Sequence, residues 1–148
     1  MISKILVPID GSACSLKALR QAKQLAEKLH ARLDLLTVIP EISATEQVPS
    51  AYVYSSSGDK TMIKIAEEVL EKAKRSLGDF EYGVTTTYLF GNVAKEIVSF
   101  SDNQKSDLIV IGSRGLGAFS RTLLGSVSQK VTNLSKVSVM VVKSDCND

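Results

Sequence analysis

The chain has few aromatic residues and little excess charge. Aromatic side chains make up 5% of its 148 residues, and 18 lysines and arginines stand against 16 aspartates and glutamates. A nucleic-acid surface needs a concentrated basic patch, and a single-strand site also needs aromatic rings on which bases stack. The sequence offers neither, so we expect no nucleic-acid partner.

Long apolar stretches are also lacking. No run approaches the roughly 20 apolar residues that a membrane-spanning helix requires. Met1 leads almost directly into a predicted strand at 5–9, without the basic segment, long apolar core or cleavage site of a signal peptide. We therefore expect a cytoplasmic protein with no membrane association.

Histidine and cysteine, which build many catalytic and metal sites, are scarce. The two cysteines, Cys14 and Cys146, match neither a metal-binding spacing nor a redox CxxC motif. The single histidine, His30, lies at the predicted end of a helix, where we interpret it as a surface or C-cap residue. No Ser-His-Asp triad and no metal cluster is predicted.

The sequence does contain a regular alternation of strand and helix patterns. Such alternation predicts a single α/β domain, in which helices cover both faces of a parallel sheet. The polar stretch at 43–58 is predicted to be a mobile loop. Strands are predicted at 5–9, 33–39, 84–89, 108–111 and 137–142, and helices at 13–29, 60–77, 93–100 and 126–134.

Capping residues and apolar stripes define the predicted helices. Ser12 is a preferred N-cap residue directly before the helix at 13–29, and Gly91-Asn92 precedes the helix at 93–100. The helix at 60–77 carries an apolar stripe that predicts its buried face. This stripe consists of Met62, Ala66, Val69, Ala73 and Leu77.

The most informative motif follows the strand at 108–111. Gly112, Gly115 and Gly125-Ser126 form the pattern G-x-x-G-x9-G-S, which leads from a buried strand into the helix at 126–134. Glycines let backbone N–H groups approach phosphate oxygens closely, and the first amides of a helix add partial positive charge. Ser126 can cap the helix or bond a phosphate oxygen. The pattern predicts a phosphate-binding loop, and a glycine-rich turn is the alternative.

This loop matches neither common nucleotide motif. Gly112, Gly115 and Gly117 give GxxGxG rather than the dinucleotide fingerprint GxGxxG, and Gly125-Ser126 lacks the lysine of a Walker A loop. In doubly wound sheets, ligands bind beyond the carboxyl ends of the strands, where the strand order reverses. If the first and fourth strands flank that point, Asp10 and the glycine loop converge on one crevice, which favours a nucleotide site.

With these residues assembled, the whole chain resembles the ATP-binding subgroup of the universal stress proteins. The resemblance is carried by residues 4–12 (KILVPIDGS), 91–94 (GNVA) and 106–115 (SDLIVIGSRG), together with the rest of the glycine loop. It implies a five-stranded parallel sheet of order 3-2-1-4-5 and an adenine nucleotide α-hydrolase-like fold. It also implies a stress-response protein that binds ATP, with Mg²⁺ or Mn²⁺, across the first and fourth strands.

The resemblance also implies roles for single residues. Asp10 and the backbone of Val38 would contact the adenine or ribose. Within the loop, Arg114 is a candidate to neutralise phosphate charge, with a solvated side chain as the alternative. The walls and the phosphate contacts would come from Pro8, Ile9, Ile111, Gly112, Gly115, Gly125, Ser126 and Val127.

These residues favour binding over catalysis. Asp10 is the one carboxylate that we place in the site, where it can bond the ribose or reach a magnesium ion held mainly by phosphates; its alternative role is to cap the first helix. No general base or P-loop lysine is predicted for fast hydrolysis. We therefore expect an ATP-binding regulatory protein whose nucleotide state changes a contact with a partner protein or a second copy. The alternatives are a slow ATPase or phosphoryl- or adenylyl-transfer enzyme, and a stress protein without nucleotide.

The last strand predicts a homodimer. Residues 137–142 are apolar and β-branched, and they carry neither proline nor charge to protect an exposed sheet edge. Pairing with the same strand of a second copy satisfies both edges with two-fold symmetry, and the resemblance implies the same interface. The alternative is that residues 143–148 cover this edge.

Overall fold

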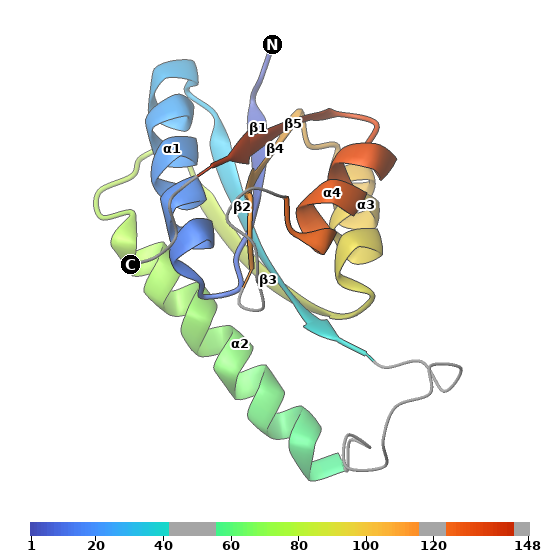
Figure 1. The fold of residues 1–148 in the computed structure, drawn as a ribbon. Coiled ribbons are helices and arrows are strands. Elements are labelled where there is room, and N and C mark those ends of the chain that lie inside the picture. The colour runs from blue at the N-terminus through green and yellow to red at the C-terminus, as the bar shows by residue number, and fades with distance from the viewer. Residues whose placement is uncertain (42–55, 116–123, 144–148) are drawn as a thin grey trace.

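The computed structural model describes residues 1–41, 56–115 and 124–143, in which strands and helices alternate (Figure 1). No helix among these residues is long and apolar enough to cross a membrane. The elements are β1 (Lys4–Pro8), α1 (Ala13–Leu29), β2 (Arg32–Pro40), α2 (Ser56–Ser76), β3 (Val84–Gly91), α3 (Val93–Gln104), β4 (Leu108–Gly112), α4 (Ser126–Leu134) and β5 (Ser138–Val142).

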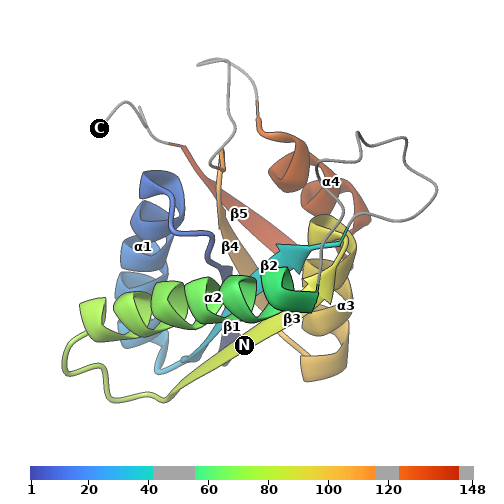
Figure 2. The same ribbon diagram turned by 90° about the horizontal axis from the view of Figure 1, so that it is seen from below.

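The five strands form one parallel sheet in the order β3-β2-β1-β4-β5, which confirms the predicted fold class and strand order. Helices α1 and α2 cover one face, and α3 and α4 cover the other (Figures 1 and 2). The chain builds outward from β1 to β3 and then returns to add β4 and β5 on the opposite side of β1. The strand order therefore reverses between β1 and β4.

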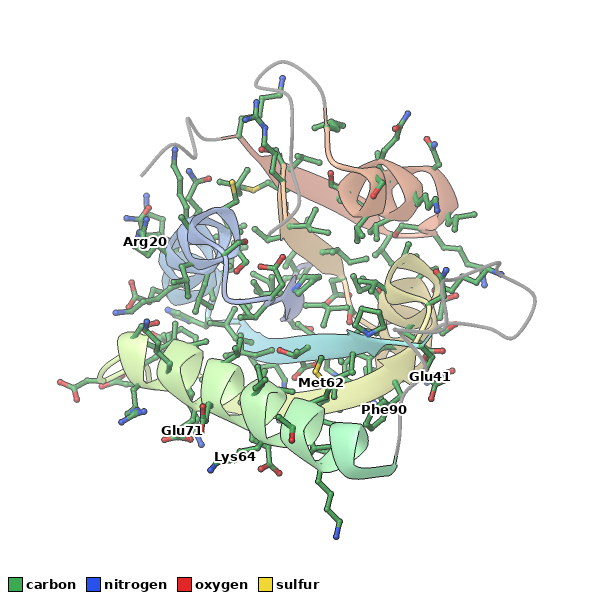
Figure 3. All side chains as sticks on the ribbon, turned by 60° about the horizontal axis from the view of Figure 1, so that its bottom comes forward. Arg20, Glu41, Met62, Lys64, Glu71 and Phe90 are labelled. Atoms are coloured by element: carbon green, nitrogen blue, oxygen red, sulfur yellow. The ribbon has the colours of Figure 1, made fainter. Side chains whose placement is uncertain are left out.

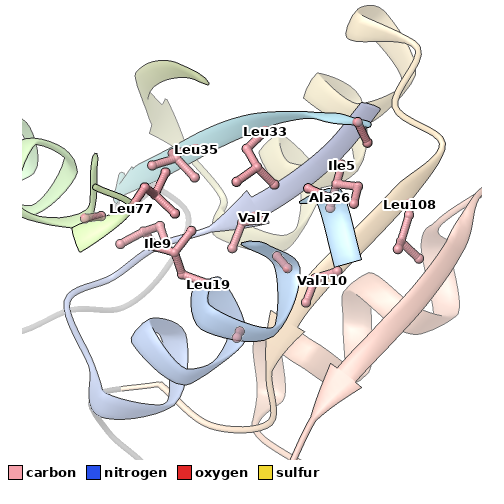
Figure 4. Close-up of a cluster of buried hydrophobic side chains, with 14 of the residues drawn as sticks. Ile5, Val7, Ile9, Leu19, Ala26, Leu33, Leu35, Leu77, Leu108 and Val110 are labelled. Carbon is pink, nitrogen blue, oxygen red and sulfur yellow. The ribbon is translucent and has the colours of Figure 1, made fainter. Parts of the chain in front are cut away.

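An apolar core lies on each face of the sheet. Ile5 and Val7 of β1 belong to the cluster under α1 and α2 (Figure 4). Leu6 belongs to the cluster under α3 and α4. Alternate residues of a strand point to opposite faces, so a central strand buried on both faces is apolar throughout. This is why β1 shows a continuous apolar run instead of an alternating pattern.

The limits of α1 agree with the prediction at both ends. Ser12 is the N-cap, and its hydroxyl oxygen accepts a hydrogen bond from the backbone N–H of Ser15 at 3.2 Å. His30 is the C-cap with a left-handed φ of 55°, and its N–H donates to the carbonyl of Ala26. The ring of His30 stacks on Tyr82 with centroids 4.9 Å apart, at the end of the sheet opposite to the glycine loop.

Two helices are longer than predicted. Helix α2 begins at Ser56, so residues 56–58, which the serine-rich composition assigned to a mobile loop, are helical; the earlier part of that segment lies outside the described residues. Helix α3 continues past Phe100 to Gln104. Its buried stripe includes Ser101 after Ala94 and Ile97, and a serine at a core position interrupts the apolar periodicity on which the prediction rested.

Candidate functional site

A cavity of about 440 Å³ lies at the carboxyl ends of β1, β2 and β4. It forms because β1 leads to α1 on one face of the sheet, whereas β4 leads to α4 on the other, which leaves a crevice between the two connections. All the candidate residues predicted from the sequence line this one cavity: Pro8, Ile9, Asp10, Val38, Ile111, Gly112, Arg114, Gly115, Gly125, Ser126 and Val127.

The segment after β1 is held in place by local hydrogen bonds. The carbonyl of Ile9 accepts a bond from Thr37 Oγ1 at 2.8 Å, which ties this segment to β2. Asp10 Oδ1 accepts a bond from the backbone N–H of Ser12 at 2.9 Å. Asp10 therefore supports the turn into α1, while Ser12 caps the helix itself. The Asp10 side chain is exposed and lies at the cavity.

Val38 presents its backbone to the cavity. Residues two apart in a strand point their backbone N–H and C=O groups toward the same neighbouring strand. The carbonyl of Leu36 points toward β1, because it accepts a bond from Ile9 N at 2.8 Å, and the groups of Val38 therefore face that side too. Since β1 ends at Pro8, opposite Leu36, the Val38 groups lie beyond the end of β1. They form a donor and acceptor pair at the cavity wall.

Two glycines of the motif lie where a side chain would collide. A Cβ at Gly112 would lie 2.9 Å from the backbone carbonyl of Cys14, so this glycine allows the end of β4 to pack against the start of α1. A Cβ at Gly115 would lie 2.9 Å from Asp10 Oδ2. The second glycine thus brings the glycine loop against the end of β1, and the two parts of the sequence motif meet as predicted.

The first turn of α4 closes the glycine loop. The N-cap is Gly125, not Ser126, and its N–H donates to the carbonyl of Ser113 at 2.7 Å. Ser128 Oγ donates to the same carbonyl at 3.1 Å. The first helical bond runs from Gln129 N to Gly125 O, so the amides of the preceding turn have no partner within the helix. This turn places the positive end of the helix dipole at the cavity.

The cavity has an apolar end and a polar end. Among the described residues that line it, the charged ones are Asp10 and Arg114, both on the polar side with the glycine loop. Arg114 is half-buried. The described residues contain no group of three or more His, Cys, Asp or Glu side chains that could hold a metal ion by themselves.

The universal stress protein family model matches residues 1–143. The chain belongs to the universal stress protein family. Universal stress protein YxiE of Bacillus subtilis is 36% identical, with 97% of this chain and 100% of YxiE covered. The solved structure of MJ0577 from Methanocaldococcus jannaschii superposes with a TM-score of 0.84 at 29% identity, covering 98% of each chain. A universal stress protein solved in complex with cAMP is 30% identical, with a TM-score of 0.66 and 96% and 98% of the two chains covered.

This universal stress protein has cavity residues that the motif analysis missed. Among them are residues of α2: Met62, Ala66 and Val69, which were predicted to lie on its buried face, also line the cavity, together with Ile65. Ala66 is buried and Val69 packs against the core, as predicted. Figure 3 shows Met62 on the side of α2 that faces the sheet, with Lys64 and Glu71 on the outer side. The apolar stripe was a correct signal for the inward face of the helix, but periodicity cannot distinguish a core from a cavity wall.

Proposed function

We propose that this universal stress protein is an ATP-binding regulatory protein of the stress response. The observation that carries the proposal is the polarity of the cavity, which is lined by apolar side chains of α2 on one side and by the glycine loop and the first turn of α4 on another. The relative solved in complex with cAMP supports an adenine nucleotide as the ligand class. The complete G-x-x-G-x9-G-S motif, whose glycines and Ser126 are the candidate phosphate contacts, supports a triphosphate.

The apolar end suits the base. The N–H and C=O of Val38 match the acceptor N1 and the donor amino group on one edge of adenine, whereas guanine presents the opposite pattern on that edge. Pro8 and Ile9 line the same end of the cavity. Asp10, on the polar side of the cavity, can accept hydrogen bonds from ribose hydroxyl groups.

The polar end suits phosphates. Backbone amides at Ser126 and Val127 lie at the positive end of α4, and Gly112, Gly115 and Gly125 line the same cavity. Asp10 Oδ2 lies next to Gly115, so a phosphate bound at this glycine would lie beside a carboxylate and would need a counter-charge. Mg²⁺ or Mn²⁺, held mainly by the phosphates, would supply that charge, with Asp10 as a candidate oxygen ligand and Arg114 as an additional cation.

Binding without fast turnover gives the protein a regulatory role. The nucleotide joins the β1 side of the sheet to the β4 side, and its presence or its phosphate number changes the surface that is offered to a second copy or to a partner protein. Such a switch works only if the two nucleotide states differ in affinity for that partner.

The first test is calorimetric titration with ATP in the presence of magnesium. Gly115→Val should bind ATP at least about tenfold more weakly than the wild type, because its side chain meets Asp10 and displaces the loop from the phosphates. Gly78→Asn is the control, since Gly78 lies far from the cavity in a left-handed conformation that asparagine tolerates. Equal affinities for wild type and Gly115→Val, or no binding to wild type, would sink the assignment.

A further inference from the structure

The pairing of β1 with β2 ends on a side chain in place of a backbone group. The register Pro8↔Leu36 places Ile9 opposite Thr37, and Ile9 N donates to the Leu36 carbonyl at 2.8 Å, as in a regular parallel pair. The next bond of such a ladder would run from Val38 N to the Ile9 carbonyl. The backbone hydrogen bonds of the described residues do not include it. The Ile9 carbonyl instead accepts a bond from Thr37 Oγ1 at 2.8 Å.

The position of Thr37 in β2 directs its hydroxyl to this carbonyl. Leu33 and Leu35 belong to the core cluster under α1 and α2, and alternation puts the Thr37 side chain on the same face of the sheet. Thr37 is only 8% exposed, so its hydroxyl needs a partner within the protein. Leu33 N donates to the Gly83 carbonyl, and by alternation the backbone groups of Thr37 also face β3. The backbone of Thr37 therefore faces β3, while its hydroxyl bonds the segment after β1.

This side-chain bond has two consequences at the cavity. The Ile9 carbonyl belongs to the planar peptide group that leads into Asp10, so the bond fixes the orientation of that group. On the other side, Asp10 Oδ1 accepts a bond from Ser12 N at 2.9 Å, so Asp10 is held from both directions. The backbone of Val38, which would otherwise continue the ladder, faces the space beyond β1 at the cavity.

We infer that Thr37 is a positioning residue of the proposed nucleotide site. Its hydroxyl takes the place of the Val38 N–H, ends the ladder one bond early and orients the peptide before Asp10. Without the hydroxyl, the Ile9 carbonyl would need another donor, and the ladder offers it the Val38 N–H, so the two strands would close by one bond. The effect on a ligand rests on the proposed function, whereas the effect on the ladder can be tested without a nucleotide.

Amide hydrogen exchange, followed by NMR, tests the effect on the ladder. In the wild type, the Val38 amide should exchange at least about tenfold faster than that of Leu36, which lies in the paired part of β2. Thr37→Val keeps the shape of the side chain and removes the donor, so it should slow Val38 exchange by at least about tenfold. Thr37→Ser, which keeps the hydroxyl, should match the wild type. Thr86→Val is the control, because Thr86 is exposed on β3 and does not line the cavity.

Calorimetric titration measures the effect on the ligand. Thr37→Val should weaken ATP binding about tenfold, whereas Thr37→Ser and Thr86→Val should stay within about twofold of the wild type. Equal Val38 exchange in wild type and Thr37→Val would overturn the inference, whether or not the protein binds ATP. Slower exchange with unchanged ATP affinity would overturn the positioning role. A wild type that binds no ATP would overturn the proposed function and the positioning role with it, while the exchange rates would still decide how the ladder ends.

Discussion

Single residues in the glycine loop have packing roles as well as proposed ligand roles. Gly112 was predicted as a phosphate contact, but the structure also shows that it lets β4 pack against the backbone at Cys14. That contact joins residues far apart in the chain, so it cannot be predicted from the sequence around either residue. Gly115 differs, because its neighbour is Asp10 of the first motif. A substitution at Gly112 therefore tests the fold together with the site, whereas one at Gly115 tests the site more directly.

The candidate site could be predicted at residue level where a motif carries it. Asp10 and the glycines stand out in the sequence because such residues in strand-to-helix connections rarely serve the core. Ile65 and Met62 could not be identified in this way, since an apolar residue on a helix face indicates burial only. Whether that face meets the sheet or a cavity depends on how far α2 extends beyond the strands, which is a property of the tertiary structure.

The same residues lead to a prediction about catalysis. Asp10 already accepts a hydrogen bond from Ser12 N. No other residue of the proposed site is a candidate general base. We expect ATP hydrolysis far below the median enzyme turnover of about 10 per second. Phosphate release by purified wild type, with Asp10→Ala as the comparison, measures this. Rapid turnover that Asp10→Ala abolishes would make the protein an enzyme and contradict the regulatory proposal.

At the scale of elements, the start of β1 is fixed by one carboxylate. Asp107, directly before β4, accepts hydrogen bonds from Ser3 N and Ser3 Oγ, both at 2.9 Å, and from Lys4 N at 3.0 Å. These bonds lower the pKa of Asp107 below 3.8, and the bond from the Ser3 backbone N–H has the largest effect. The amino ends of the two central strands are thereby joined through a charged side chain, at the opposite end of the sheet from the cavity.

This link predicts a pH dependence of stability. A carboxylate whose pKa is lower in the folded state stabilises the fold above its unfolded pKa, and the contribution is lost as the pH falls through the folded pKa. Asp107→Asn should lower the Tm by a few degrees at pH 7, and the difference from wild type should shrink below pH 3.8. Thermal unfolding at both pH values checks this, with Asp79→Asn in an exposed connection as control. A constant difference across the pH range would exclude the ionised link.

The elements themselves could be predicted more fully than their ends. Strong periodicity and a capping serine set both limits of α1 correctly. The start of α2 could not be predicted, because a serine- and glycine-rich segment has low helix propensity and forms helix here only as the first turns of a long one. The extension of α3 was hidden by Ser101, a buried polar residue at an apolar position.

For the whole molecule, the outer edge of β5 is the feature that bears on assembly. Ser113 N donates to Val142 O at 3.0 Å, so Val142 faces β4, and by alternation the backbone groups of Val139 and Val141 face outward. The strand lies at the edge of the sheet. The residues from 144 onward, which were the alternative cover for this edge, lie outside the described part of the chain.

We predict a homodimer through this edge. Val139→Pro removes an N–H that points away from β4, so it should abolish edge pairing while leaving the sheet intact. Val141→Lys should act in the same direction by placing charge at the interface. Analytical ultracentrifugation should show a dimeric wild type and monomeric variants, with an unchanged Tm for Val139→Pro as evidence of folding. A wild type that sediments as a monomer at micromolar concentration would overturn the proposal.

The cavity is built from residues that extend from Pro8 to Ser128 of the chain. A growing polypeptide on the ribosome therefore has no complete site until almost all of it has been synthesised. The nucleotide that we propose for this site would stabilise the finished fold and not its partly folded precursors. In kinetic terms, a saturating nucleotide should slow unfolding and leave the rate of folding nearly unchanged, so that the ligand preserves mature molecules without assisting new ones to form.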